Sequence, residues 1–333
     1  MKATAMKAYV VEQPGGPEAL KLRDIATVTP GAEEVRIRVK AFGLNRAEVY
    51  RRSGKMGPIE GQVVPGIEAV GEVAEDPSGT FRVGQKVATA MGGLQFSRNG
   101  SYAEEVTVLR SNVADMSGTT LAWEELAALP ESYLTVWGAL GRLIGNGPHQ
   151  TVLIRGATSS LGQAGVAYAK ALGHRVIATT RSRGHADRLT FIGADEVVID
   201  TGAIANIVRE ISPEGIDVAL EVVGAATVRD TLATLKPFGD AVVVGLLGGA
   251  PVIETLNLMG DLPQATRLSF FGSALLGSPA LPLSPFPLTW IADQITAGTM
   301  PSLRVQTFDF DEVQRAHSLI ESDRALGKLV VRL

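Results

Sequence analysis

The sequence predicts an α/β protein in which a doubly wound parallel sheet is joined to a second, β-rich domain. From residue 151 to about 247, short apolar runs alternate with helical segments, as they do in repeated β–α units. From residue 1 to about 125, short β-type runs separated by Gly and Pro turns favour a β-rich barrel instead. The length of 333 residues also exceeds what one hydrophobic core usually serves.

The Val- and Ile-rich runs of the alternating region are typical of parallel strands that are covered on both faces. We expect strands at 151–155, 175–180, 196–200, 216–224 and 240–245, with helices between them at 161–172, 184–192, 203–211 and 226–235. The barrel strands are expected at 7–11, 33–43, 69–74, 85–93 and 102–108. Helical stretches at 119–130 and 132–145, separated at Pro130, mark the junction between the domains. A proline-rich loop (277–288), helices near 288–297 and 311–321 and a strand at 328–333 complete the chain.

Composition excludes several functions. The net charge of −4 offers no basic surface for nucleic acid or for an anionic membrane. The chain has no cysteine, which removes disulfides, thiolate nucleophiles and thiolate metal ligands. Its four histidines show no metal-ligand spacing, so no metal site is expected. Neither the amino-terminal stretch nor the apolar run at 241–253 suits a signal peptide or a membrane span, which predicts a cytoplasmic protein.

The turn after the first parallel strand has the pattern GxxSxxG, formed by Gly156, Ser159 and Gly162. A helix that begins at such a turn presents free backbone N–H groups to a pyrophosphate. Gly156 suits a tight turn, Gly162 and Gly165 suit close packing of the helix, and the hydroxyl of Ser159 or Ser160 is available to the ligand. The alternative is an ordinary small-residue turn of an α/β fold.

The end of the second parallel strand predicts which dinucleotide binds. An NAD enzyme places an acidic residue there, on the ribose hydroxyls, whereas this chain has Thr180, Arg181, Ser182 and Arg183. Guanidinium and hydroxyl groups favour a 2′-phosphate, so we expect NADPH as the cofactor. The missing acid also disfavours S-adenosylmethionine. The alternative is that the arginines are simply solvated surface residues.

Ten segments in order resemble the zinc-independent quinone oxidoreductase branch of the medium-chain dehydrogenase/reductase superfamily. They are GGPEALKLRD, FGLNRAEVYRRSG, PGIEAVGEV, VGQKV, GSYAEE, LTVWGAL, GATSSLG, GADEVVID, VVVG and ALGKLVV. The resemblance implies a GroES-like catalytic domain (1–125), a Rossmann domain for NADPH (126–265) and a return to the catalytic domain (266–333). It aligns the family's first residue with Met6, so residues 1–5 are expected to be an extension or an alternative start.

The zinc-dependent alcohol dehydrogenases of this superfamily have a cysteine and a histidine ligand that this chain lacks. The resemblance puts Asn45 and Ile67 at those two positions, and neither is a usual zinc ligand. Glu68, which follows Ile67, is expected to be structural. Hydride transfer without zinc requires an acceptor that is already electrophilic, so the expected substrate is a quinone or an α,β-unsaturated carbonyl compound.

The resemblance also implies roles for individual residues. Asn45 and Tyr50 are expected beside the acceptor, where either donates to the developing oxyanion and Tyr50 or water completes protonation. Cofactor contacts are expected from Thr135, Gly156, Ser159, Ser160, Leu161, Gly162, Thr180, Arg181, Ser182, Arg183, Gly224, Gly245, Leu246 and Lys328.

Structural alternatives stay open for several of these residues. Tyr50 is alternatively a packed aromatic, Asn45 a turn cap, Thr135 a helix residue that bonds its own backbone and Lys328 a strand-edge lysine. Arg51 and Arg52 are expected on a solvated face.

Two other functions are open, and so is the state of assembly. The chain is alternatively an enoyl-thioester reductase, or an NADPH-binding sensor without turnover. By the same resemblance, the segment 268–274 is expected to pair with its copy in a homodimer.

Overall fold

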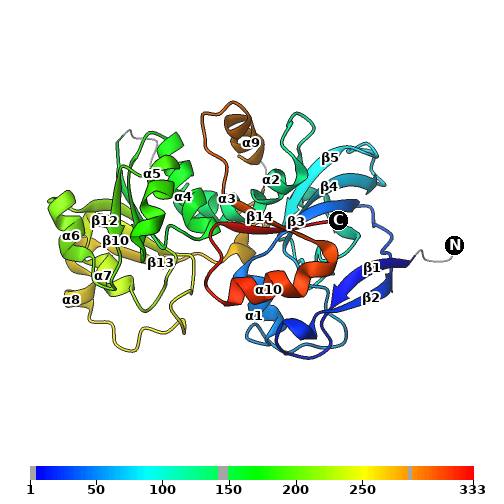
Figure 1. Ribbon diagram of the computed structural model, residues 1–333, viewed down its shortest axis with the longest axis horizontal. Coiled ribbons are helices and arrows are strands. Elements are labelled where there is room, and N and C mark those ends of the chain that lie inside the picture. The colour runs from blue at the N-terminus through cyan, green and yellow to red at the C-terminus, as the bar shows by residue number, and fades with distance from the viewer. Residues whose placement is uncertain (1–4, 142–148, 284–286) are drawn as a thin grey trace. The chain divides into compact units, whose positions relative to one another are not determined.

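The computed structural model describes residues 5–141, 149–283 and 287–333 of the chain. The chain divides into two compact units: unit 1 comprises residues 1–134, 273–296 and 303–333, and unit 2 comprises residues 135–272 and 297–302 (Figure 1). These limits differ from the sequence-based ones, 125 and 265. Residues 126–134 group with unit 1, where the backbone of Glu131 donates to Glu68. Residues 266–272 group with unit 2, because the strand they contain pairs within its sheet.

Unit 2 is built on a parallel sheet of six strands among the described residues, in the order β10-β9-β8-β11-β12-β13. The strands are β8 (Thr151–Arg155), β9 (Arg175–Thr180), β10 (Glu196–Ile199), β11 (Ile216–Glu221), β12 (Leu235–Val243) and β13 (Arg267–Phe270). The helices are α4 (Ser160–Ala171), α5 (Ala186–Phe191), α6 (Ala205–Ile211), α7 (Val228–Leu232) and α8 (Leu258–Asp261), with 3-10 turns η3 (Arg183–His185) and η4 (Pro263–Ala265). The predicted doubly wound sheet is confirmed.

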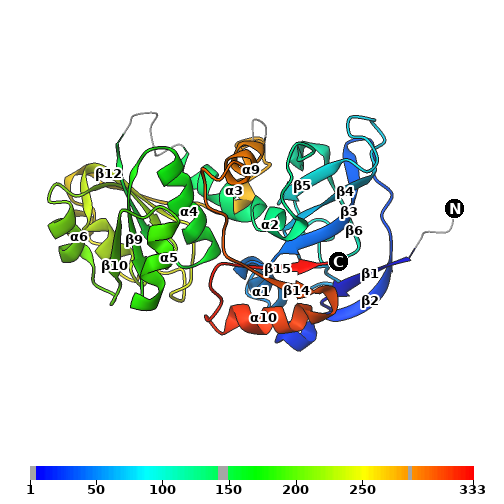
Figure 2. The same cartoon turned by 45° about the horizontal axis from the view of Figure 1, so that its top comes forward.

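The helices of unit 2 cover both faces of its sheet (Figure 2). Residues of α6 and α7 pack with Leu153 and Ile177 in one apolar cluster. On the opposite face, Gly165 of α4 lies against Ile154 and Leu220. The absence of a side chain at Gly165 allows the helix to pack this closely on the sheet, as the sequence predicted. One boundary was predicted poorly: β12 begins at Leu235, inside the expected helix 226–235, because the chain pairs with Ile216 of β11 before a register shift.

A buried arginine connects the strand ends of unit 2. Arg155, the last residue of β8, is fully buried. Its guanidinium donates to both carboxylate oxygens of Asp200 at 2.8 and 3.0 Å, and to Asp230 at 2.7 Å. Further bonds go to the hydroxyl of Thr231 and to backbone oxygens of Thr227 and Gly202. These contacts compensate the buried charge and fix the strand ends beside the β8–α4 turn.

Unit 1 contains the expected β-rich domain. Its main sheet has seven strands among the described residues, in the order β14-β15-β3-β4-β5-β7 with β6 paired to β3. The strands are β3 (Glu34–Gly43), β4 (Glu68–Glu75), β5 (Lys86–Ala90), β6 (Glu105–Leu109), β7 (Val113–Asp115), β14 (Val305–Asp309) and β15 (Lys328–Arg332). β1 (Ala5–Val10) and β2 (Lys21–Ala26) form a separate antiparallel pair. The sequence missed β2, β7 and β14, since these strands are short or largely exposed and carry little apolar alternation.

The helices of unit 1 are α1 (Arg46–Arg52), α2 (Trp123–Ala127), α9 (Leu288–Thr296) and α10 (Val313–Glu321). The 3-10 turns are η1 (Pro17–Ala19), η2 (Arg110–Asn112), η5 (Ser273–Leu275) and η6 (Phe310–Glu312). Helix α3 (Pro130–Leu140) contains the boundary between the units. Pro130 starts this helix, where its missing N–H does no harm. Three predicted segments lie partly outside the described residues. They are the extension 1–5, the helical stretch 132–145 and the loop 277–288.

No helix in the described parts of the chain is both long enough and apolar enough to cross a bilayer.

Candidate active site

A cluster of buried polar residues lies within unit 1, and we call it the charge cluster. It comprises Asn45, Glu48, Glu68, Glu131 and Lys328. Asn45 caps α1, Glu48 lies in α1, Glu131 lies in α3, and Glu68 and Lys328 are the first residues of β4 and β15. Glu48, Glu68 and Lys328 have no exposed area, and Glu131 is 6% exposed. Charged residues are almost never this buried unless they are paired, so the contacts between these side chains determine which of them are available to a ligand.

Lys328 supplies the cation of the charge cluster. Its Nζ lies 2.5 Å from Oε1 of Glu68 and donates to Oδ1 of Asn45 at 2.6 Å. The backbone of Gly43 lies directly against this pair, and a Cβ at that position would overlap both Cε of Lys328 and Oε1 of Glu68. Glycine is therefore required at residue 43 for the ion pair to form. The ammonium of Lys328 is thus engaged by two side chains of unit 1, and the expectation that Lys328 contacts the cofactor stays a prediction.

The side-chain amide of Asn45 is fully engaged. Its Nδ2 donates to Oε1 of Glu68 at 2.8 Å and to Oε1 of Glu48 at 3.3 Å, while Oδ1 accepts from Lys328. An amide has only two N–H hydrogens, and both are directed to carboxylates here. Asn45 therefore has no hydrogen left to donate to the oxygen of an acceptor. Asn45 stands at the N-cap position of α1, where its backbone N–H donates to Oε2 of Glu48 at 2.7 Å, and the alternative that it caps a turn stays a prediction.

Carboxyl groups outnumber the cation in the charge cluster, and this excess changes their protonation. Burial, reinforced by the charge of Glu68, raises the pKa of Glu131 to about 8. The same two causes, in the same order, raise the pKa of Glu48 to about 7. Glu48 also accepts from the backbone N–H groups of Asn45 and Ile67, at 2.7 and 3.2 Å. Burial and like charge therefore favour the protonated forms of Glu48 and Glu131, because one lysine cation cannot balance three carboxylates.

The sequence missed Glu48 and Glu131 as members of this cluster. One signal for Glu48 was present, since Asn45 and Glu48 have the N-x-x-E spacing of a capping box. Glu68 was expected to be structural, and it forms the centre of the cluster. Ile67 is buried and contributes only its backbone. Among the residues that the structure describes, no group of three or more His, Asp or Glu side chains is arranged to hold a metal ion.

Tyr50 lies on α1, two residues beyond Glu48, and is half-buried. The Nζ of Lys55 lies 5.8 Å from the centre of its ring. Its neighbours correct an expectation, because Arg51 and Arg52 are buried rather than solvated. Arg51 donates to the backbone oxygens of Pro58 and Gln95, and Arg52 pairs with Glu321. These partners are distant in sequence, which is why the local pattern did not indicate burial.

The GxxSxxG turn of unit 2 forms a tight connection between β8 and α4. Gly156 adopts φ +81°, which favours glycine, and a Cβ on Gly162 would overlap the backbone of Gly156 and Ala157. Ser159 caps α4: its hydroxyl accepts from the N–H of Gly162 at 3.0 Å and donates to the oxygen of Gly156 at 2.9 Å. Its hydroxyl hydrogen therefore serves the turn, whereas Ser160 makes no side-chain hydrogen bond within the described residues.

The residues that were expected to favour NADPH over NADH follow the end of β9. Thr180 is buried, and its hydroxyl donates to the backbone oxygen of Ser182 at 3.2 Å. Arg181, Ser182 and Arg183 are exposed. Neither arginine forms an ion pair with any residue in the described part of the chain. These cations are therefore available to an anionic ligand.

Other expected cofactor residues gather at the carboxyl ends of β11 and β12. Gly224 has φ +102°, and its Cα faces the backbone of Gly245 and Leu246 so closely that a Cβ would contact both. Leu161 lies in the first turn of α4, and Thr135 is buried in α3. Asn45, Tyr50 and Lys328 belong to unit 1, and all the other expected site residues belong to unit 2. The structure brings Asn45 and Lys328 into direct contact, and Tyr50 lies on the helix that also carries Glu48.

Comparison with known proteins also divides the chain into two domains. Residues 31–135 match the model of the alcohol dehydrogenase GroES-like domain, and residues 160–282 match that of the zinc-binding dehydrogenase domain. A 2-haloacrylate reductase of Burkholderia sp is 27% identical over 97% of this chain and 98% of its own. The human quinone oxidoreductase is 28% identical over 98% of both chains. The mycobacterial protein Rv1454c, solved in complex with NADPH, is 27% identical with a TM-score of 0.83 over 98% of this chain and all of its own.

The fold and these likenesses define the class of protein as a two-domain oxidoreductase with a GroES-like unit and a Rossmann-like unit. More particularly, the chain belongs to the medium-chain dehydrogenase/reductase superfamily and is similar to its quinone oxidoreductases.

Removing the cation should destabilise the fold strongly. In Lys328→Met, Glu68 would remain buried without its counter-ion, so we expect the free energy of unfolding to fall by about 3–5 kcal/mol in denaturant titrations. Lys40→Met is the control, because Lys40 pairs with Glu72 at a partly exposed site and should lose no more than about 1 kcal/mol. The double variant Lys328→Met/Glu68→Gln should recover part of the loss. A Lys328→Met variant as stable as Lys40→Met would contradict this account of the pair.

The raised pKa values predict a pH dependence with a definite sign. Because the pKa of Glu131 is raised from 4.5 to about 8 in the folded protein, its contribution is present at low pH and lost as the pH rises towards 8. The stability of Glu131→Gln, which lacks this loss, should therefore increase relative to wild type between pH 5 and 8, by at most about 1.4 kcal/mol per pH unit. Ser132→Ala, a buried non-titrating neighbour, is the control and should parallel the wild type. Parallel curves for Glu131→Gln would refute the assignment.

Proposed function

We propose that this protein is an NADPH-dependent reductase that transfers hydride to a quinone or an α,β-unsaturated carbonyl compound without zinc. The observation that carries the proposal is the closed charge cluster. At the position where the zinc-dependent relatives have a cysteine ligand, this chain has Asn45, and its amide is bound to Lys328, Glu68 and Glu48. The cation at this position is an ammonium held by the protein itself, which supports a mechanism without a Lewis acid.

The residues of unit 2 fit NADPH. The close approach of Gly162 to Gly156 and the start of α4 would hold the pyrophosphate, and Arg181 and Arg183 would hold the 2′-phosphate. When bound, this cofactor supplies hydride. The relative solved with NADPH supports the same choice.

The chain must then orient the acceptor and provide a proton. Since both amide hydrogens of Asn45 point to carboxylates, we assign the donation to the acceptor oxygen to the hydroxyl of Tyr50. Asn45 would act indirectly, because it caps the helix on which Tyr50 lies. The names of the relatives indicate suitable acceptors, since a quinone and a 2-haloacrylate are both conjugated electrophiles.

An acceptor panel tests the proposal. NADPH oxidation should be fast with 1,4-naphthoquinone, 2-cyclohexenone or 2-chloroacrylate, and should be unaffected by dialysis against a chelator. Preferential turnover of crotonyl-coenzyme A would favour an enoyl-thioester reductase instead. Tight NADPH binding without oxidation by any acceptor would favour a non-catalytic sensor. Loss of activity after chelation, restored by zinc, would overturn the zinc-independent mechanism.

Reversing one charge should change the cofactor preference. We expect Arg181→Asp to shift the ratio of kcat/KM for NADPH and NADH towards NADH by on the order of tenfold or more, because a charged hydrogen bond is worth roughly 1.5–3 kcal/mol. Arg175→Asp is a matched control, since Arg175 begins the strand that ends next to Arg181. An unchanged ratio in Arg181→Asp would remove this residue from cofactor recognition.

Removing one hydroxyl should separate chemistry from cofactor binding. For Tyr50→Phe we expect turnover to fall on the order of ten- to a hundredfold, with little change in the Kd for NADPH. Tyr9→Phe serves as the control, because Tyr9 packs edge-on against Phe310 in the same unit. Wild-type turnover in Tyr50→Phe would mean that water or another group delivers the proton.

We also propose that the enzyme is a homodimer, joined along β13. This strand ends the sheet of unit 2 and pairs only with β12 among the described residues, and Phe270 on it is 62% exposed. Light scattering should give twice the mass of the chain, and Phe270→Lys should shift the equilibrium towards monomer because it adds repulsion at a self-complementary edge. Phe191→Lys, at an exposed position of α5, should leave the mass unchanged. A monomeric wild-type protein would refute the proposal.

A further inference from the structure

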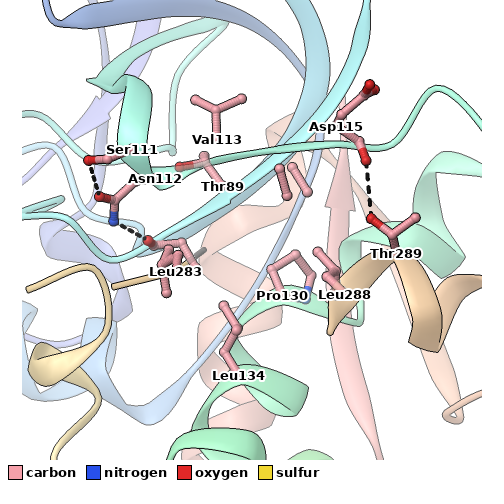
Figure 3. A pocket seen from close by; sticks show the side chains of 13 residues that line it. Thr89, Ser111, Asn112, Val113, Asp115, Pro130, Leu134, Leu283, Leu288 and Thr289 are labelled. Carbon is pink, nitrogen blue, oxygen red and sulfur yellow. Dashed lines mark hydrogen bonds between the residues drawn. The ribbon is translucent and has the colours of Figure 1, made fainter. Parts of the chain in front are cut away.

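Unit 1 contains a cavity of about 240 Å³ at the β5–β7 side of its main sheet (Figure 3). Strands β5 and β7 form one wall, with Thr89 and Val113 shown on that side in Figure 3. Pro130 and Leu134 of α3 and Leu288 of α9 lie opposite. Of the described residues that line the cavity, none belongs to the charge cluster and none is Tyr50. The cavity is thus a separate feature of unit 1.

Most of the cavity wall is apolar and small on the strand side. Alanine residues on β5 and β7 leave the space that larger side chains would fill, and leucines from α3, α9 and the preceding loop close the other side. The apolar lining residues are Ala88, Ala90, Val113, Ala114, Pro130, Leu134, Leu283 and Leu288. A concave apolar site with few polar groups is typical of small-molecule sites.

One polar group in this wall has no partner. Thr89 is 2% exposed, and its Oγ1 makes no hydrogen bond within the described residues, although its backbone lies between two paired strands. Buried hydroxyl groups without a partner are rare and unfavourable. The neighbouring polar side chains are already engaged: Nδ2 of Asn112 donates to the oxygen of Ala90 at 3.0 Å, and Oγ1 of Thr289 donates to the oxygen of Asp115 at 3.3 Å. The hydroxyl of Thr89 is therefore the group that a ligand could satisfy.

We propose that this cavity binds a small, mostly apolar molecule, about the size of one substituted ring, whose single oxygen pairs with the hydroxyl of Thr89. The size follows from the volume, since an apolar cavity of about 150 Å³ in another protein holds benzene. The largely apolar walls, with Asp115 as their charged residue among those described, disfavour an anionic ligand, which would lose its hydration without compensation. The single unpartnered hydroxyl requires one hydrogen-bonding group on the ligand, at the end that reaches β5.

Calorimetric titration with 4-methylphenol and with p-xylene, which replaces the hydroxyl by a methyl group, tests the proposal. The wild-type protein should bind both probes saturably. Thr89→Val keeps the shape of the side chain but removes its hydroxyl, so it should weaken 4-methylphenol binding by about three- to tenfold and leave p-xylene binding unchanged or tighter. The variant itself should be at least as stable as wild type, because it removes the unpartnered group.

A second pair of variants keeps the test independent of folding defects. Leu134→Phe and Ala114→Val each add volume to the wall from a different element, and each should abolish or strongly weaken binding of both probes. Absence of binding to the wild-type protein would overturn the proposal. So would binding that none of the three substitutions changes, or a crystal soaked in 4-methylphenol that shows only a water molecule beside Thr89.

Discussion

The buried ion pair between Lys328 and Glu68 is the interaction on which unit 1 depends. A buried pair is favourable only if further hydrogen bonds complete the coordination of both charges. Asn45 meets this requirement for both partners at once, because its oxygen accepts from Lys328 and its nitrogen donates to Glu68. The backbone of Glu131 adds a bond to the second oxygen of Glu68 at 2.8 Å. The start of β15, the start of β4, the cap of α1 and the start of α3 are therefore fixed by one set of contacts.

The two units solve the same electrostatic problem differently. In unit 2, Arg155 directs its donors to Asp200 and Asp230, and its neighbours hold the pKa of Asp200 below its ordinary value despite burial. The charged form of Asp200 is thereby favoured, and its bonds to Arg155 fix the strand ends. In unit 1, a lysine with a single compact charge faces three carboxyl groups, and burial raises the pKa of two of them. Unit 2 thus has a buried guanidinium paired with two acids, whereas burial in unit 1 favours the protonated forms of Glu48 and Glu131.

Local sequence patterns predicted the strands and the tight turn of unit 2, but not the contacts between residues far apart in the chain. The parallel strands β8, β9 and β10 agree with the sequence to within a residue, because runs such as TVLIR must be covered on both faces. Gly156 and Gly162 were found from the spacing that a tight turn imposes. The charge cluster could not be found in this way, since its contact between Asn45 and Lys328 joins residues 283 positions apart. Arg51 and Arg52 look like surface residues in the sequence for the same reason. Arg51 donates to backbone oxygen and Arg52 pairs with Glu321, and no local pattern in the sequence indicates these partners.

The discontinuity of unit 1 has a consequence for how the chain reaches its native state. Residues 135–272 of unit 2 are made between the two parts of unit 1 that the ion pair joins. During synthesis on the ribosome, Glu68 emerges long before Lys328, so the nascent barrel has its acidic residues but not the ammonium that neutralises them. The parallel sheet of unit 2 can fold in that interval, since its own buried arginine and the acids paired with it all lie within residues 155–230. The enzyme is therefore expected to mature from the middle outwards, with the strand that carries Lys328 closing the barrel last.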